Sequence, residues 1–186
     1  LGFDMTGYDV SAAMLAKAEQ LSAAEGVFPH YVLCDARKIA TLGGRADFAL
    51  CVNDCVNYLP QRDIPRFFAR VAGCLKKGGA FLFDVSSEYK LREIVGSNAF
   101  CEDREEVAYL WFNTLKSDRV EMDFTLFIQE KDGRFRREDE RHVQYIHAES
   151  DLRSAAERAG FSVRAVEGSF GDKEDKTRRN FLCVRL

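Results

Sequence analysis

A short apolar strand followed at once by an acidic residue and a helix is the strongest structural constraint in this chain. Residues 5–10 form a run bounded by polar residues, which predicts a buried strand with Asp9 near its carboxyl end. Ser11 is a good N-cap, and the residues after it favour a helix that reaches Glu25 and ends at Gly26. In open α/β sheets, ligands bind beyond the carboxyl ends of the strands, where a carboxylate can accept hydrogen bonds from ribose hydroxyls. We therefore expect a nucleotide-like ligand beside Asp9.

Strand and helix patterns continue to alternate up to about Ala99. Strands are predicted at 30–34, 47–52 and 80–85, a helix at 63–74, and glycine turns at Gly43–Gly44 and at 76–79. Alternation of this kind implies parallel crossovers, so the fold class is α/β with a doubly wound, mostly parallel sheet.

The pattern changes after Ala99. Three long β-rich segments at 107–114, 120–129 and 135–146 predict an antiparallel meander, and a helix at 149–159 and a strand pair at 162–166 and 180–186 follow. We therefore expect three parts: an α/β core over residues 1–99, an antiparallel β insertion over 100–147, and a helix with a strand pair over 148–186 that completes the core.

Composition excludes several classes of partner. The chain has 186 residues, of which 46% are apolar, and a net charge of −3, which argues against a dedicated nucleic-acid binder. No apolar run approaches the ~20 residues of a membrane helix, and no signal peptide is visible. The six cysteines lack CxxC spacing, which indicates reduced, buried thiols in a cytoplasmic protein. The aromatic residues of the meander are expected to pack as a core, with an aromatic pocket or a homodimer face as the alternative.

Five short motifs follow one another along the chain. They are Gly7–Leu15, Cys34–Ala36, Ala46–Asp54, Leu75–Asp84 and Ala159–Phe161. In this order they resemble the class I S-adenosylmethionine-dependent methyltransferases, some bacterial members of which insert an antiparallel β-layer as a substrate lid. The resemblance implies a Rossmann-like fold, S-adenosyl-L-methionine as cofactor, and methyl transfer to a small-molecule acceptor.

One motif of that family is missing from the sequence. The family's glycine loop, which follows its first strand and cradles the methionine end of the cofactor, occurs nowhere in these residues. In the family's sheet the first strand lies between the second and the fourth, so its loss would leave the centre of the sheet unpaired. We therefore expect the native protein to carry an upstream segment of roughly 40–60 residues, the size of the missing part of a βαβ unit.

The resemblance also gives roles to residues that follow the predicted strands. Asp9 would hold the ribose and Asp35 the adenine amino group, while the other expected cofactor contacts are Val10, Met14, Ala36, Asn53 and Asp54. Each has a structural alternative: a turn or capping role for the two aspartates, core packing for Met14, and an ordinary polar loop for residues 53–54.

The sequence gives less specific evidence about the residues that bind the methyl acceptor. Asn57, Tyr58 and Tyr89 are expected near the acceptor, and no catalytic residue is assigned. His142 and His147 are separated by an odd number of residues, so on a regular strand they would face opposite sides, and we interpret both as structural. Cys51 and Cys55 match no common zinc pattern, so no metal is predicted.

Two other functions remain open from the sequence. An acidic residue in the position of Asp9 also occurs in dinucleotide-dependent oxidoreductases, where it follows the second strand of the cofactor-binding unit. A non-catalytic cofactor-binding or interaction module could keep the same fold, because fold alone does not prove activity.

Overall fold

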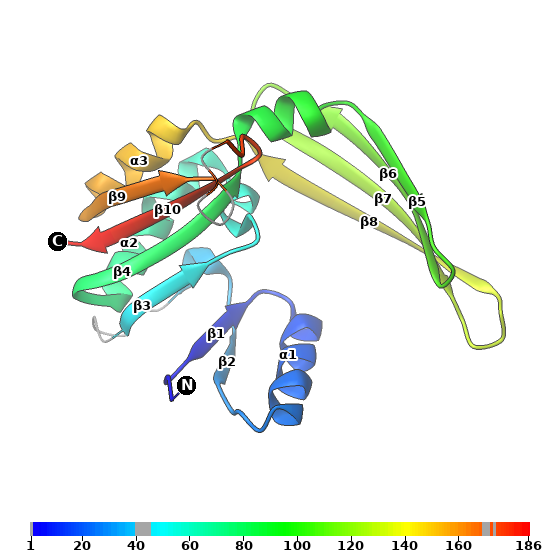
Figure 1. The fold of residues 1–186 in the computed structure, drawn as a ribbon, viewed down its shortest axis with the longest axis horizontal. Coiled ribbons are helices and arrows are strands. Elements are labelled where there is room, and N and C mark those ends of the chain that lie inside the picture. Colours follow the sequence, from blue (N-terminus) through cyan, green and yellow to red (C-terminus); the bar gives the residue numbers. More distant parts are fainter. Residues whose placement is uncertain (1, 40–45, 169–171, 173) are drawn as a thin grey trace.

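The computed structural model describes residues 2–39, 46–168, 172 and 174–186, and the turn predicted at Gly43–Gly44 lies outside them. The α/β part contains two separate sheets (Figure 1). In the smaller, β1 (Thr6–Asp9) and β2 (His30–Leu33) pair in parallel and are joined by α1 (Ala12–Ala24). The larger has the order β3-β4-β10-β9, with β3 (Ala46–Cys51), β4 (Leu75–Ser86), β10 (Arg178–Arg185) and β9 (Phe161–Glu167). β3 and β4 run parallel, whereas β10 runs antiparallel to both of its neighbours.

The two sheets face each other with unpaired edges. β1 and β3 each end their own sheet, and no strand of the described residues lies between them. Around β3 the side chains of Phe48, Leu50 and Val52 are 47–51% exposed. The gap falls at the centre of the Rossmann-like order, where the sequence predicted that a strand would be lacking.

The main core lies between the larger sheet and two helices, α2 (Ile64–Cys74) and α3 (Glu149–Arg158). In α2 the buried apolar residues recur at helical spacing (64, 67, 68 and 71), and Pro65 sits in the first turn, where its missing N–H costs nothing. Six phenylalanines from the helices and strands form one cluster of ring contacts, with Phe83 stacked on Phe181 at 4.6 Å between ring centroids. This cluster packs β4, β9 and β10 against α2.

The third sheet extends away from the core (Figure 1). It is an antiparallel meander of β5 (Ala99–Asp103), β6 (Val107–Leu115), β7 (Arg119–Gln129) and β8 (Phe135–Tyr145). A one-turn π-helix, η4 (Lys90–Val95), links β4 to this sheet. Leu91 and Val95 of η4 form a second small core with Val120 and Met122 of β7.

Two boundaries differ from the sequence prediction. β4 begins at Leu75, directly after α2, because the expected glycine turn at 76–79 is an irregular extension of the strand in which Gly78 has φ +79°. β5 is absent from the sequence prediction, since its five residues are three apolar residues followed by two acidic ones, which is too short a pattern to indicate a strand. None of the helices in the described ranges is long and apolar enough to cross a membrane.

Candidate functional site

The carboxyl ends of β1 and β2 meet at one edge. Asp9 is the last residue of β1, and its carbonyl accepts a 2.8 Å hydrogen bond from the amide of Cys34. The Asp9 carboxylate accepts a 2.7 Å bond from the amide of Ser11, whose own hydroxyl caps α1 by accepting from the amide of Met14. Asp9 therefore stabilises the turn after β1 through Oδ1, and its Oδ2 takes no part in that hydrogen bond.

The predicted apolar cofactor contacts next to Asp9 are exposed. Val10 is 74% and Met14 61% exposed. Core packing, the alternative considered for Met14, is therefore not its role in this structure. The two exposed side chains leave apolar surface beside the Asp9 carboxylate.

Asp35 follows β2 and caps the short 3-10 helix η1 (Ala36–Lys38), in which the predicted contact Ala36 is the first residue. Both carboxylate oxygens of Asp35 accept hydrogen bonds from the guanidinium of Arg37, at 2.5–3.0 Å. These bonds lower the pKa of Asp35 to about 2. The carboxylate is thus charged and held by a neighbour, as the turn alternative expects.

Asn53 and Asp54 form the turn after β3. Both have left-handed backbones, with φ of 59° and 49°, a conformation that asparagine and aspartate tolerate better than other side chains. The amide of Asp54 donates to Oδ1 of Asp84 at 3.2 Å. The sequence placed these two residues where the reacting groups should meet, and the strained backbone orients Asp54 back toward β4.

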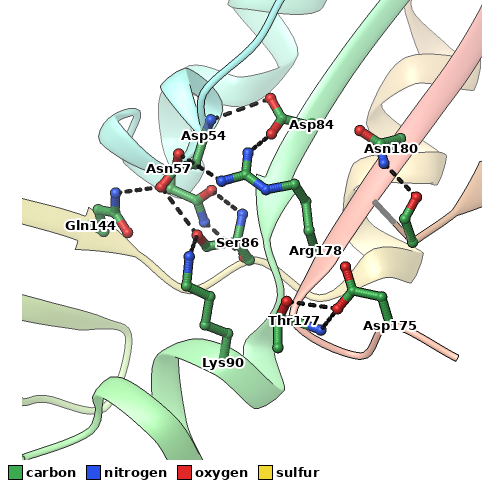
Figure 2. A network of polar contacts seen from close by, with 11 residues as sticks. Asp54, Asn57, Asp84, Ser86, Lys90, Gln144, Asp175, Thr177, Arg178 and Asn180 are labelled. Carbon is green, nitrogen blue, oxygen red and sulfur yellow. Dashed lines mark hydrogen bonds and ion pairs between the residues drawn. The ribbon is translucent and has the colours of Figure 1, made fainter. Parts of the chain in front are cut away.

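Asp54 is the centre of a polar network that joins three parts of the chain (Figure 2). Its Oδ2 accepts hydrogen bonds from Ser86 Oγ at 3.0 Å and from Gln144 Nε2 at 2.8 Å. Arg178 lies 3.4 Å from Oδ1 of Asp54 and forms an ion pair with Asp84. Lys90 Nζ donates to the Ser86 hydroxyl at 3.1 Å. β3, β4, β8, β10 and η4 are therefore tied together at this point.

Asn57 has a structural role. Its side chain is fully buried; Nδ2 donates to the carbonyls of Ser86 and Tyr145, and Oδ1 accepts from the amide of Ser86 at 2.9 Å. Because the amide group is already engaged within the protein, we revise its expected role from substrate contact to a brace between β4 and β8.

Tyr58 lies in a small cavity between this network and the β5–β8 sheet. The cavity has a volume of about 170 Å³ and is lined by Asp54, Tyr58, Lys90, Val95, Trp111, Met122, Phe124, His142 and Gln144. Trp111 and Phe124 stack with ring centroids 5.0 Å apart, so the aromatic residues of the meander both pack together and wall the cavity. Burial raises the pKa of Tyr58 above its usual value.

Tyr89 lines a different cavity. That space, of about 320 Å³, is bounded by residues of β4, α3 and β10 together with His147, Lys176 and Arg179. His142 and His147 are therefore in separate places: β8 ends at Tyr145, so strand alternation does not relate them. The structure brings Tyr58 and Asp54 together and sets Tyr89 apart from both.

The Cys55 thiol lies just after the turn that follows β3. The hydrogen bond between Cys51 and Cys55 lowers the pKa of the Cys55 thiol. Burial opposes that lowering, and so does the charge of the Asp9, Asp54 and Asp35 carboxylates. The described residues hold no group of three or more His, Cys, Asp or Glu side chains that could bind a metal ion.

Several residues of the site gave no usable sequence signal. Arg178 contacts Asp54 across 124 positions, and Gln144 across 90. Asp84 ends the motif Leu75–Asp84, but the sequence gives it no predicted role. A carboxylate within the otherwise apolar strand at 80–85 is a signal that could have identified it as a site residue.

Comparisons with known proteins give the family of the chain. The family described as "Methyltransferase domain" matches residues 1–79. The chain is 32% identical over 178 residues to "Putative methyltransferase GWCH70_2453" of Geobacillus sp. (strain WCH70). The match covers 92% of this chain and 70% of that one. It is 29% identical to "Putative methyltransferase YqeM" of Bacillus subtilis (strain 168), covering 99% and 75% of the two chains.

Solved structures extend the similarity to the whole fold. An S-adenosylmethionine-dependent methyltransferase from Clostridium acetobutylicum superposes with a TM-score of 0.92 at 27% identity, over 98% of this chain and 75% of that one. The sugar N-methyltransferase KedS8 from Streptoalloteichus sp. shares the fold with a TM-score of 0.77 at 19% identity, over 97% and 70%. The relative from Geobacillus and the structure from Clostridium acetobutylicum together show that the chain belongs to the class I S-adenosylmethionine-dependent methyltransferases.

Proposed function

We propose that this protein transfers a methyl group from S-adenosylmethionine to a small-molecule acceptor held between the core and the β5–β8 sheet. The observation that carries the proposal is the position of Asp54. It stands in the turn that follows the carboxyl end of β3, and it also lines the aromatic cavity beneath the β5–β8 sheet. One residue therefore borders both a cofactor region and an acceptor region.

The residues at the carboxyl edge fit this cofactor. The carboxylates of Asp35 and Asp54 are each paired with an arginine, so the negative charge offered to a cationic ligand would come mainly from Asp9. Oδ2 of Asp9 is not used in its turn hydrogen bond and can accept from a ribose hydroxyl, and the exposed Val10 and Met14 can cover a flat base. When bound, the sulfonium would supply an electrophilic methyl group.

Within this proposal the other cofactor residues keep their predicted places. Asp35 and Ala36 would meet the adenine end, and Asn53 with Asp54 the methionine end. Since Arg37 already occupies the Asp35 carboxylate, any contact of Asp35 with adenine would share that carboxylate with the guanidinium.

The protein would contribute to the reaction mainly by placement. Bringing two reactants into line converts a bimolecular step into an intramolecular one, and a dry cavity spares the nucleophile its hydration shell. The Asp54 network would fix the floor of the acceptor cavity, and Trp111 and Phe124 its aromatic wall.

The three parts of the chain would have different roles in the reaction. We propose residues 1–99 as the cofactor-binding core, 100–147 as a lid over the acceptor, and 148–186 as the segment that completes the core. The sugar methyltransferase named among the structural neighbours supports a small-molecule acceptor. The six free cysteines support a cytoplasmic location.

Transfer of a labelled methyl group tests the proposal. The purified protein is incubated with [methyl-¹⁴C]-S-adenosylmethionine and the low-mass fraction of a deproteinised bacterial lysate. We expect label to move into small molecules at a rate proportional to protein concentration, and heat-denatured protein to give none. Absence of transfer, together with failure to bind S-adenosylhomocysteine at millimolar concentration, would sink the enzymatic assignment.

A further inference from the structure

Tyr58, His142 and Glu140 form a chain of hydrogen bonds at the rim of the acceptor cavity. The Tyr58 hydroxyl lies 3.3 Å from Nδ1 of His142, and Nε2 of His142 lies 3.0 Å from Oε2 of Glu140. Tyr58 comes from η2 (Cys55–Tyr58), which follows the Asn53–Asp54 turn, whereas the other two come from β8. The chain therefore exists only where the core and the β5–β8 sheet meet.

Strand geometry places these β8 residues on the cavity side. Glu140, His142 and Gln144 alternate along β8 and so share one face of the sheet. The register pairs them with Phe124, Met122 and Val120 of β7, and two of these β7 residues, Phe124 and Met122, line the cavity. Phe124 also meets the His142 ring edge-on, at 5.4 Å between centroids.

The partners of His142 select its protonation pattern. A carboxylate can only accept a hydrogen bond, so Glu140 requires the proton to be on Nε2. Nδ1 then keeps its lone pair and accepts the hydrogen bond that Tyr58 donates. Burial raises the pKa of Tyr58, although a hydrogen bond from Gln144 opposes this, so the phenol carries its proton at neutral pH; a third group would meet its oxygen in place of Gln144. The side chain of Tyr58 is 45% exposed, so that third group can come from the cavity.

We propose that Tyr58, His142 and Glu140 form a proton relay that removes the proton of the acceptor during methyl transfer, an inference that rests on the function proposed above. The acceptor's nucleophilic atom bonds to the methyl carbon while the electron pair of the broken carbon–sulfur bond stays on sulfur. The proton of the nucleophile passes to the Tyr58 oxygen as the phenol proton passes to Nδ1 of His142. The resulting imidazolium is paired with the Glu140 carboxylate, so the charges balance.

The relay restricts the class of acceptor. A nucleophile that must lose a proton, such as a hydroxyl or a protonated amine, gains from a base at this position, whereas a thioether has no proton to lose. The charged groups that face His142 or its cavity are Glu140 on its own strand, Asp54 from the turn after β3, and Lys90 from η4. Aromatic packing alone would explain the ring contacts of Tyr58 and His142 but not the carboxylate beyond them.

The protonation pattern can be read directly by NMR of protein with ¹⁵N-labelled histidine, assigned by comparison with His142→Asn. We expect neutral His142 to carry its proton on Nε2, and Tyr58→Phe to shift the Nδ1 resonance because that nitrogen loses its donor. A neutral ring protonated on Nδ1 would overturn the relay, since that nitrogen could not take a proton from Tyr58.

Methyl transfer to the same deproteinised low-mass pool supplies the functional test. General base catalysis contributes about 10²–10⁴-fold, so we expect Tyr58→Phe and His142→Asn to slow transfer by at least roughly 10-fold. Tyr109→Phe in β6 and His30→Asn at the start of β2 are matched controls and should leave the rate unchanged. Glu140→Gln should slow transfer while leaving the affinity for S-adenosylhomocysteine unchanged, because the imidazolium formed in the step loses its carboxylate. Equal transfer rates in Glu140→Gln and the unchanged protein would contradict a role for Glu140 in the relay.

Binding of S-adenosylhomocysteine separates the two ways in which the account could fail. If Tyr58→Phe and His142→Asn bind it as the unchanged protein does and also transfer methyl groups at the full rate, the relay is wrong and the proposed function stands. If the unchanged protein neither binds it nor transfers methyl groups, the proposed function fails and the relay fails with it.

Discussion

The carboxylate of Asp84 on β4 and the guanidinium of Arg178 on β10 form an ion pair beside the turn that follows β3. Asp84 is 4% exposed, and its Oδ1 also accepts the amide hydrogen of Asp54. The left-handed turn that carries Asp54 is thus held by a buried charge, and that charge is balanced by Arg178 on β10, near the end of the chain.

We expect Arg178→Met to destabilise the protein strongly. Removal of one partner of a buried ion pair leaves an uncompensated charge, at a cost of about 3–5 kcal/mol in the free energy of unfolding. Urea denaturation measures the effect. The matched control is Lys76→Met, which removes an exposed ion pair with Asp47 and should cost less than about 1 kcal/mol. Equal losses in the two variants would show that the Asp84–Arg178 pair is not the brace described.

Gln144→Leu should loosen the attachment of the β5–β8 sheet to the core. Gln144 is 7% exposed and donates to the Asp54 carboxylate at 2.8 Å, and a hydrogen bond to a charged group contributes about 1.5–3 kcal/mol. We expect a loss of that size in urea denaturation, with faster amide exchange along β8. Gln129→Leu, at the exposed end of β7, changes the same residue type and should have little effect on either measurement.

His147 should make stability depend on pH near neutrality. The side chain is 3% exposed, and burial lowers its pKa below the ordinary 6.5. The folded protein therefore prefers the neutral ring, so this contribution is fully present above pH 6.5 and is lost as the pH falls through the lower folded-state value. Thermal unfolding from pH 8 to pH 5 should show the decline, and His147→Gln should flatten it. A curve that is identical in the two proteins would contradict this role.

Gly96 ends η4 in a conformation that other residues rarely adopt, with φ +45° and ψ −125°. A Cβ at this position would lie 2.6 Å from the carbonyl oxygen of Arg92. Gly96→Ala should cost about 1–3 kcal/mol and disturb Lys90 and Val95 at the acceptor cavity. Gly26→Ala also has a positive φ but meets nothing within 4 Å, so it should cost less. The difference between their melting temperatures measures the steric part.

Local sequence patterns predicted most of the fold because most of it depends on local chemistry. Ser11 and Gly26 bound α1 through capping and a left-handed end, and the apolar spacing of 64, 67, 68 and 71 gave α2. The start of β4 differs from the prediction because Leu75 pairs with Ala46 of β3 ahead of the turn-like residues 76–79. Those four residues have no partner in the register with β3, so their local preference survives as an irregularity within the strand.

The site was predictable only where it follows strands. Asp9, Asp35 and Asp54 stand at strand ends, and a parallel arrangement brings such ends to one edge. Gln144 and Arg178 reach Asp54 from far along the chain, and no spacing rule connects them. Asn57 was misjudged for a related reason: an asparagine in a loop has the same appearance whether its amide meets a ligand or two backbone carbonyls.

Calorimetric titration with S-adenosylhomocysteine tests the central claim most directly. We expect the protein to bind S-adenosylhomocysteine and not NAD. Asp9→Asn keeps an oxygen for the Ser11 amide but loses the charge, and it should weaken binding by roughly 10-fold, which corresponds to about 1.4 kcal/mol. Asp4→Asn, exposed ahead of β1, should bind as the unchanged protein does. Binding of NAD in preference to S-adenosylhomocysteine, or affinity that is the same in Asp9→Asn and the unchanged protein, would contradict the account.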